Sequence, residues 1–364
     1  LHYAHLCAQA GGVDAFCIGT EMRGVTTIMG ATGFPAVDRL RILAAEVKAI
    51  LPAATITYAA DWTEYHGHQP PGTQDKHFHL DPLWADPAIG AVAIDNYMPL
   101  SDWRDGEDHA DASWGSVHSL DYLAANVAGG ELFDWFYHSE EARAAQIRTP
   151  ITDEGEQEPW VWRLKDLKSW WSNEHRDRVG GLRRSAPTPW VPQSKPIWFT
   201  EIGCAAVDKG TNEPNKFLDP KSSESALPRH SNGLRDDLVQ IAYYRALFRH
   251  FADPEANPTS ALYGGRMVDM DRAHAWAWDA RPWPHFPLDR DRWADGANHA
   301  RGHWLNGRAS ARPLASVVAA ICRDAGLADA DTSRLHGLVR GLVIEQAGTA
   351  REALQPLMLA QGFD

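Results

Sequence analysis

Short apolar runs alternate along this chain with segments in which apolar residues recur every three or four positions. The runs are rich in β-branched and aromatic residues, and their length and composition favour buried strands. We therefore expect five strands. Their ranges are Val13–Glu21, Thr55–Trp62, Ala91–Tyr97, Pro196–Gly203 and His274–Ala280.

Amphipathic helices are expected between these strands. A short helix over Tyr3–Ala10 stops at Gly11, and a longer one begins at Pro35 and ends before Pro52. The helix after the fourth strand is expected to bury one face. That face comprises Leu238, Ile241, Tyr244, Phe248 and Phe251. Continuous apolar strands separated by amphipathic helices predict a parallel sheet covered by helices.

Polar side chains stand at the carboxyl end of every predicted strand, which is typical of a (β/α)8 barrel. A doubly wound sheet would more often carry a glycine-rich phosphate turn, and the chain has neither G-x-G-x-x-G nor a P-loop. A closed barrel needs eight strands. Because the chain starts at Leu1 with a helical pattern already under way, we expect the first three strands to lie upstream.

Two further segments depart from the barrel pattern. Residues 98–195 are too long for a simple loop, so we expect an insertion with its own helices over the barrel mouth. After Pro313, one helical face, a strand at Leu338–Glu345 and a helix at Arg351–Leu359 predict a small α+β module. The expected domains are therefore a barrel over 1–310, holding strands four to eight, and the start of a second module over 311–364. The expected helical face comprises Leu314, Val317, Val318 and Ile321.

Composition narrows the function classes. The chain has 35 Lys and Arg against 48 Asp and Glu, for a net charge of −13, which argues against nucleic acid or an anionic membrane as the main partner. No apolar run reaches the length of a membrane span, and no signal peptide begins this fragment. The 16 tryptophans favour a carbohydrate ligand, because indole stacks on sugar rings. The four cysteines lack paired spacing and are expected to be buried free thiols.

Two carboxylates occupy positions suited to catalysis. Glu21 ends the first predicted strand and Glu201 ends the fourth. Glycoside hydrolysis needs two carboxyl groups, and strands distant in sequence can present them to one cleft. The alternative is that each is a solvated or ion-paired residue at a loop edge. Other residues at strand ends are expected to contact substrate, and these are Trp62, Asp95, Asn96, Tyr97 and Trp278.

The phrase KPIWFTEIG at Lys195–Gly203 resembles the nucleophile strand of the large glycoside hydrolase clan of (β/α)8 barrels. This resemblance implies that Glu201 is the nucleophile on strand seven and Glu21 the acid/base on strand four. It also implies that Tyr97 contacts the nucleophile and that Trp278 is a sugar platform on strand eight. The clan usually has Asn before the acid/base, whereas this chain has Thr20, which leaves open a barrel that binds sugar without cleaving it.

The chain also resembles the glycoside-hydrolase-like barrel of gene transfer agent and phage tail hub proteins. The resemblance implies binding of cell-envelope polysaccharide or peptidoglycan, with other tail or baseplate proteins as partners. It places the protein in the tail of a phage-like particle assembled in the cytoplasm and then released, and 311–364 at the start of a phage-tail module. The phrases that carry it are GGVDAFCIGTEMRG, YAADWTEYHGHQP, HLDPLWADPAIGAVAIDNYMPLSDWRDG, WWSNEHRDR, WAWDARPWPHFP and RGHWLNGR.

Several other clusters are weaker candidates. Four loop histidines in two His-x-His pairs, His66 with His68 and His77 with His79, could bind zinc, although exposed or sugar-contacting histidines are the expectation, and we expect no metal or cofactor. The acidic run 102–111 lacks the ligand spacing of a calcium loop and is expected to be solvated. Arg23 either contacts substrate or the Glu21 carboxylate, or forms a surface ion pair. The tryptophans of the insertion fit helix packing or a sugar platform; they are Trp160, Trp162, Trp170 and Trp171.

Overall fold

A computed structural model describes residues 1–222, 225–305 and 311–364 of the chain. These residues form two compact units. The first comprises residues 1–203 and 244–275, and the second comprises 204–243 and 276–364. The predicted boundary after residue 310 lies outside the described residues.

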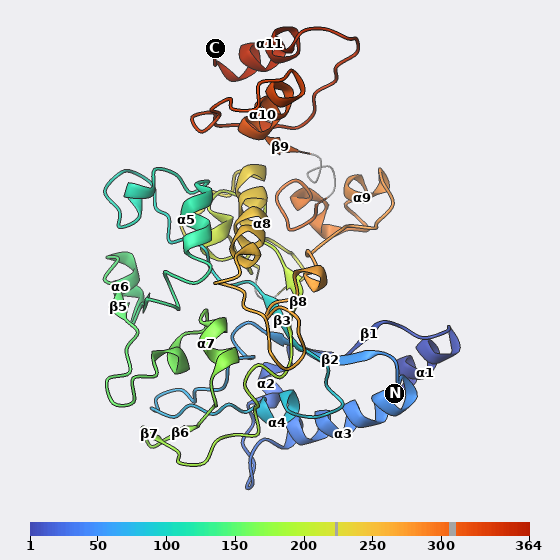
Figure 1. Cartoon of the computed structure of the whole chain (residues 1–364), viewed down its shortest axis with the longest axis vertical. Coiled ribbons are helices and arrows are strands. Elements are labelled where there is room, and N and C mark those ends of the chain that lie inside the picture. Colours follow the sequence, from blue (N-terminus) through green and yellow to red (C-terminus); the bar gives the residue numbers. More distant parts are fainter. Residues whose placement is uncertain (223–224, 306–310) are drawn as a thin grey trace. The chain divides into compact units, whose positions relative to one another are not determined.

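The first unit is built on a parallel sheet of four strands in the order β1-β2-β3-β8 (Figure 1). Each strand coincides with one of the first four predicted apolar runs, which confirms that these segments are strands. The predicted burial of the first is wrong, because β1 lies at the edge of the sheet and none of its residues is buried. The core of β3 is fully buried, as expected for a strand covered on both faces. The strands are β1 Ala15–Thr20, β2 Thr55–Asp61, β3 Val92–Asn96 and β8 Ile197–Ile202.

The fifth predicted strand, His274–Ala280, does not form. The chain runs parallel to β8 and pairs with it only at two isolated bridges, Ile197 with Val268 and Ile202 with Ala275. Between the bridges it leaves the sheet as a 3-10 helix, η4 Met270–Arg272. The apolar pattern at 274–280 therefore marks the end of a broken pairing segment and not the start of a strand.

Two bulges set the register at the carboxyl ends of the strands. Ile94 lies opposite Phe199, but Asp95 lies opposite Glu201, so Thr200 is an extra residue on β8. A similar irregularity in β1 falls between Cys17 and Thr20. Bulges of this kind redirect side chains and are frequent beside active sites. Here the bulge in β8 places Glu201 directly beside Asp95.

Helices cover the sheet on one side through α3 Pro35–Ile50, which lies along β1 and β2 (Figure 1). Pro35 stands at the first helical turn, where its missing N–H costs nothing, and the helix ends at Ile50, with Leu51 as its C-cap before Pro52. Its buried face carries Val37, Leu40, Ala44 and Val47. The expected helix at the N-terminus is also present as α1 His2–Gln9, and shorter helices are α2 Arg23–Thr26 and α4 Asp81–Trp84.

The helix α8 Asp237–Ala252 is present where it was predicted, but its buried face was predicted wrongly. Phe248 is 48% exposed, whereas Tyr243 and Ala246 are fully buried. The helix is apolar on more than one side, so periodicity alone could not select which side faces the core. The buried side comprises Val239, Ala242, Tyr243, Ala246, Leu247 and Phe251.

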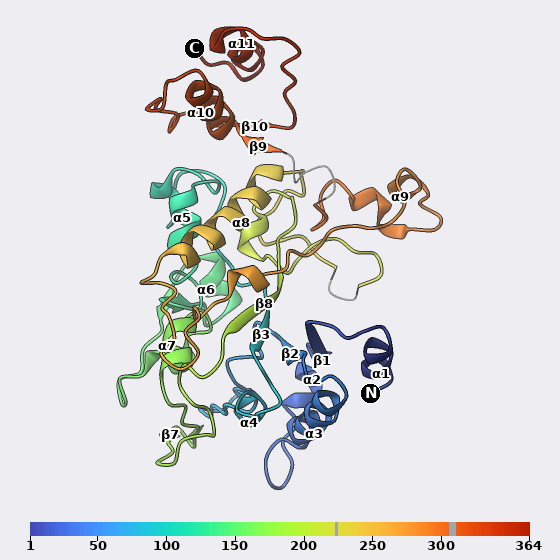
Figure 2. The same ribbon diagram turned by 45° about the vertical axis from the view of Figure 1, so that its right-hand side comes forward.

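Residues 98–195 form short helices and hairpins, as expected of an insertion. Figures 1 and 2 show α5, α6 and α7 on the β3 and β8 side of the sheet. The helical elements are η1 Ala112–Trp114, α5 Leu120–Ala125, α6 Glu140–Ala144, η2 Pro159–Trp162 and α7 Leu167–Ser172. Antiparallel pairs join β4 Trp135–Phe136 with β5 Thr149–Pro150, and β6 Arg178–Val179 with β7 Leu182–Arg183.

The middle of the acidic run 102–111 is exposed as expected, at Asp105, Glu107 and Asp108, but Asp102 and Asp111 belong to an ion-pair network. Asp102 is buried and accepts hydrogen bonds from Tyr137 at 2.6 Å and from Arg148 at 3.0 Å. Arg148 also pairs with Asp111 at 2.8 Å, and its guanidinium lies 4.1 Å from the centre of the Trp135 ring. Arg148 thus neutralises the carboxylates at the two ends of the acidic run.

The second unit contains short helices and a terminal α+β module. The strands β9 Arg312–Pro313 and β10 Leu338–Val339 pair antiparallel, so the strand expected at 338–345 is shorter than predicted. The helices α10 Leu314–Asp324 and α11 Ala350–Gln361 match the predicted pattern. Their core comprises Leu314, Val318, Cys322, Val339 and Leu357. The remaining elements are η3 Gly210–Asn212, α9 His285–Leu288 and η5 Ala294–Asn298.

None of the helices in the described ranges has the length and apolar character needed to cross a membrane.

Gly67 begins a tight loop between β2 and α4. Its φ is +136°, and a Cβ there would lie 2.7 Å from the His77 carbonyl oxygen. We expect Gly67→Ala to lower the free energy of unfolding by about 2 kcal/mol or more, because positive φ and the backbone clash both oppose alanine. Gly72→Ala is the control, since Gly72 also has positive φ but no atom within 4 Å. Equal losses in chemical denaturation would contradict this account.

Candidate active site

Glu21 directly follows β1 and has a left-handed backbone, with φ of 48°. Its N–H donates to the Ala59 carbonyl at 2.8 Å, so the pairing of β1 with β2 holds this conformation. Burial and, to a smaller extent, the charges of nearby carboxylates together raise the pKa of the Glu21 carboxyl to about 7. Those carboxylates belong to Asp95, Asp61, Glu201 and Glu64.

Glu201 stands on β8, next to the end of the strand. The hydroxyl of Tyr97, which follows β3, donates to its Oε2 at 2.6 Å. The pKa of Glu201 is raised to about 7, because burial and the charge of Asp95 raise it by more than the Tyr97 hydrogen bond lowers it. The contact that the sequence predicts between Tyr97 and Glu201 is therefore present.

The two glutamates are close enough to interact, because the charge of Glu201 raises the pKa of Glu21. Their surroundings differ in one respect. Tyr97 donates to Glu201 and favours its ionised form, whereas the charged groups that shift the pKa of Glu21 are all acidic. We expect Glu201 to lose its proton first and Glu21 to keep its proton to higher pH. One protonated and one ionised carboxyl is the combination that acid–nucleophile chemistry requires.

Asp95 lies between the two glutamates in the sheet. Its Cα is paired with Asp61 on β2 and with Glu201 on β8, so the three side chains occupy one face. Asp95 is buried, which raises its pKa, and its Oδ2 accepts a hydrogen bond from Thr20 at 3.0 Å. The neighbouring Asn96 is also buried, and its Oδ1 accepts from the Met98 N–H at 3.2 Å.

Arg23 opens α2, two residues beyond Glu21. It donates a hydrogen bond to the Thr63 hydroxyl and lies 4.0 Å from an Asp61 carboxylate oxygen. The Arg23 side chain is 58% exposed. Its observed contacts are therefore those of an ion pair at the surface, which was the alternative to a contact with substrate or with Glu21. Trp62 follows β2 and is partly buried. The substrate contacts expected of Arg23 and Trp62 stay predictions.

The sequence patterns did not reveal a buried glutamate beneath the site. Glu64 is 1% exposed and accepts hydrogen bonds from the hydroxyls of Thr26 and Tyr58. The Tyr58 hydroxyl in turn accepts from the Met22 N–H at 2.7 Å, next to Glu21. This network connects the β2 end to the backbone that carries Glu21. The position of Glu64 just beyond a predicted strand was the available signal in the sequence. Its burial could not be predicted, because it depends on the packing of α2, which carries Thr26.

Trp278, the predicted sugar platform, belongs to the second unit, where its side chain is 67% exposed. Its assignment to substrate stays a prediction. Three of the four insertion tryptophans have a packing role, because Trp160, Trp170 and Trp171 are buried. The fourth, Trp162, is partly exposed and lines a cavity.

The loop histidines are largely buried and not exposed as expected. His68 and His77 exchange two backbone hydrogen bonds, of 2.7 and 2.8 Å, which bring the two pairs together. His66 and His79 are buried, and burial lowers the pKa of His79 to about 3. Within the described ranges, no three His, Cys, Asp or Glu side chains are grouped to hold a metal ion. The cysteines described there are all free thiols, and Cys204 and Cys322 are buried as expected, whereas Cys17 is exposed and Cys7 only partly buried.

The first unit is an α/β domain with a parallel four-stranded sheet, and carboxylates gather at the carboxyl ends of its strands. A family model for the GTA TIM-barrel-like domain matches residues 1–287, so the chain belongs to this gene transfer agent barrel family. No curated protein matches the chain. The match confirms the resemblance derived from the sequence motifs, and it identifies a barrel domain related to phage-like particles.

The raised pKa of Glu201 has a consequence for stability. An ordinary Glu has a pKa near 4.5, and the folded value of about 7 means that the folded state binds the proton more tightly. Folding stability is therefore lost as pH rises from about 4.5 to 7. We expect Glu201→Gln to raise the free energy of unfolding at pH 8 by about 1 kcal/mol, allowing for solvent screening, with no change at pH 4.

Denaturant titration at the two pH values measures this effect. Glu46→Gln is the control, because Glu46 is an exposed glutamate on α3. A gain for Glu201→Gln that is the same at both pH values would show that burial of its charge is not the cause.

Proposed function

We propose that this domain is a retaining glycosidase acting on cell-envelope glycan, polysaccharide or peptidoglycan. The observation that carries the proposal is the pair of interacting glutamates, both with pKa raised to about 7 and only Glu201 held by a tyrosine. Paired carboxyl groups with unequal surroundings are the usual machinery of glycoside hydrolysis.

In this mechanism Glu21 begins protonated and Glu201 ionised. Glu201 attacks the anomeric carbon while Glu21 gives its proton to the leaving oxygen, which forms a glycosyl ester on Glu201 and releases the first product. Glu21, now ionised, takes a proton from water, and the resulting hydroxide cleaves the ester and regenerates Glu201. Tyr97 steadies the charge of Glu201 before attack and when it leaves.

The domain's family supports a site of action in a phage-like particle. We propose that it acts in the particle's tail, beside other tail or baseplate proteins, and that the terminal α+β module begins a tail-hub module. In that position the barrel would meet the glycan of the cell envelope as the particle docks. Arg23, Trp62, Asp95, Asn96 and Trp278 are the proposed substrate contacts in addition to Tyr97.

A second candidate is a barrel that binds glycan without cleaving it. The residue before Glu21 favours this alternative, because Thr20 stands where the hydrolase clan usually has Asn. The Thr20 hydroxyl donates its hydrogen bond to the Asp95 carboxylate. It therefore does not donate to the 2-hydroxyl of a sugar, which is the contact that the clan's Asn makes. Glycan retention without hydrolysis is the behaviour that this alternative predicts.

Incubation with purified peptidoglycan and capsular polysaccharide separates the two candidates. We expect the unmutated chain to release reducing ends and Glu21→Gln to lower kcat/KM by about 10²–10⁴-fold, because general acid catalysis is lost. The Glu21→Gln, Glu201→Gln double variant should release none, and Glu46→Gln should match the unmutated chain. Retention of glycan with no reducing ends from any of these proteins would favour the binding barrel.

Tyr97→Phe tests the unequal ionisation of the pair. Without the hydroxyl donor the pKa of Glu201 should rise, and the acidic limb of the kcat/KM profile should move up by about one pH unit. Tyr137→Phe is the matched control, because Tyr137 also donates to a carboxylate at 2.6 Å, but in the insertion. An acidic limb that stays in place in Tyr97→Phe would remove Tyr97 from this role.

A further inference from the structure

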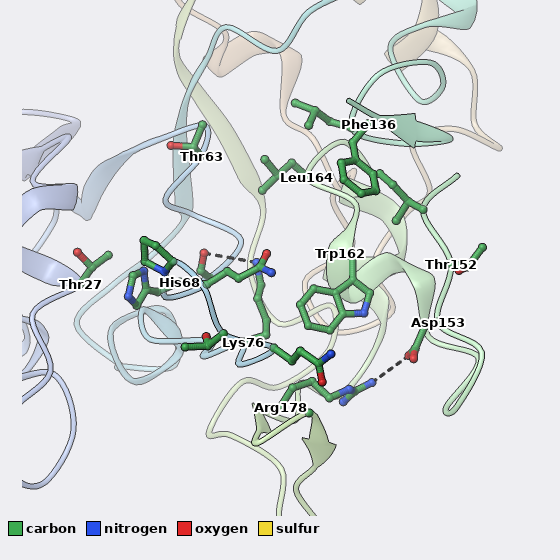
Figure 3. Close-up of a pocket in the computed structure, with 18 of the residues that line it drawn as sticks. Thr27, Thr63, His68, Lys76, Phe136, Thr152, Asp153, Trp162, Leu164 and Arg178 are labelled. Carbon is green, nitrogen blue, oxygen red and sulfur yellow. Dashed lines mark hydrogen bonds and ion pairs between the residues drawn. The ribbon is translucent and has the colours of Figure 1, made fainter. Parts of the chain in front are cut away.

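A large cavity lies beside the glutamate pair in the first unit. Its volume is about 1300 Å³, and its walls come from the segments after β1 and β2 and from the insertion (Figure 3). Glu64 both lines this cavity and raises the pKa of Glu21, so the cavity adjoins the candidate active site without containing either catalytic glutamate. Typical small-ligand sites measure about 300–1,000 Å³, so this one has room for several sugar rings.

The cavity contains a buried lysine whose charge has no partner. Lys76 is 4% exposed, and its ammonium makes one long hydrogen bond, 3.4 Å to the Gly67 carbonyl. Within the described ranges no carboxylate lies within 4 Å of it. Lys165 provides the contrast, because it is equally buried but donates to two carbonyl oxygens, each at 2.7 Å. Buried charges are normally paired, so an anion is the missing partner of Lys76.

The other basic residues of the cavity are already engaged. Arg178 pairs with Glu158 at 2.6 Å and with Asp153 at 3.3 Å. Arg23 lies near Asp61 at the edge of the site. Lys76 is therefore the side chain in the described cavity best able to bind an incoming negative charge.

The remaining walls suit a sugar. Figure 3 shows Trp162 and Phe136 on one wall, Thr27 and His68 on the opposite wall, and Lys76 between them. An indole face and a phenyl ring stack on the apolar face of a pyranose, and hydroxyl and amide groups bind its hydroxyls. Gln69 and Gln74 add amide groups to the lining. An aromatic wall with dispersed polar groups favours a carbohydrate over an acidic peptide.

The geometry points to a binding subsite for a sugar that carries a single carboxylate, with Lys76 binding the carboxylate and Trp162 stacking on the ring. A monoanion fits better than a phosphate dianion, because Glu64, Asp153 and Glu156 also line the cavity and would repel the second charge. The assignment rests on the proposed glycan-binding function but not on hydrolysis. It implies that the glycan processed by this domain is acidic.

Calorimetric titration with a mannuronic acid tetrasaccharide, and with the same tetrasaccharide after reduction of its carboxyl groups to alcohols, tests the subsite. At pH 6 the Lys76 ammonium is charged, because burial lowers its pKa only to about 7. We expect the acidic tetrasaccharide to bind the Glu201→Gln chain at least tenfold more tightly than the reduced one. The Glu201→Gln substitution prevents turnover, so this titration measures binding alone. A failure of the subsite is therefore distinguishable from a failure of the proposed hydrolysis.

Lys76→Met should abolish the preference while leaving affinity for the reduced tetrasaccharide unchanged. Lys168→Met is the control, because Lys168 is exposed on α7, outside the cavity, and bonds a carbonyl oxygen. If Lys76→Met does not fold, Trp162→Ala provides the test. An equal loss of affinity for both tetrasaccharides supports the subsite, and unchanged affinity for both overturns it.

Equal affinity of the unmutated subsite for both tetrasaccharides would overturn the assignment. So would a preference that persists in a folded Lys76→Met variant. Displacement of the acidic tetrasaccharide by acetyl-triglutamate or by inorganic phosphate at equal concentration would also overturn it. The anion bound by Lys76 would then be a peptide carboxylate or a phosphate and not the carboxylate of a sugar. A chain that shows the expected preference but releases no reducing ends from any glycan would keep the subsite and favour the binding barrel.

Discussion

The pairing of Asp95 with both of its neighbouring strands is the constraint on which the site depends. Parallel strands bring their carboxyl ends to one edge, but a regular ladder would place Thr200 and not Glu201 opposite Asp95. The extra residue in β8 restores a carboxylate to the inner face, and the irregularity in β1 sets the direction of the chain before Glu21. Several acidic groups are thereby held close together in partial burial, and burial together with their mutual repulsion raises the pKa of Glu21 to about 7.

That crowding of carboxylates is unfavourable to folding and is held in place by the surrounding structure. Hydroxyl donors, from Thr20 to Asp95, from Tyr97 to Glu201 and from Tyr58 to Glu64, each satisfy one carboxylate without neutralising it. A lysine or arginine in the same positions would stabilise the fold and remove the raised pKa values. Sites of catalysis often retain such destabilised groups because the chemistry requires them.

The sequence predicted those parts of the structure that depend on local pattern. Four strands followed from their apolar runs, and Glu21 and Glu201 were identified because they stand where such strands end. Features that need tertiary contacts were not predicted. The buried face of α8 depends on which side meets the core, and burial of Glu64 and Lys76 depends on segments that pack over them. The segment after β8 has the composition of a strand, but η4 interrupts its pairing.

Arg148 has a consequence for ligand capture. It joins Asp102 to Asp111 and lies against Trp135, directly before the Thr149–Pro150 strand that forms part of the cavity wall with Phe136. A wall fixed in this way has already lost its conformational entropy during folding. An arriving ligand therefore meets a preformed surface, and little of its interaction energy is consumed in ordering the protein.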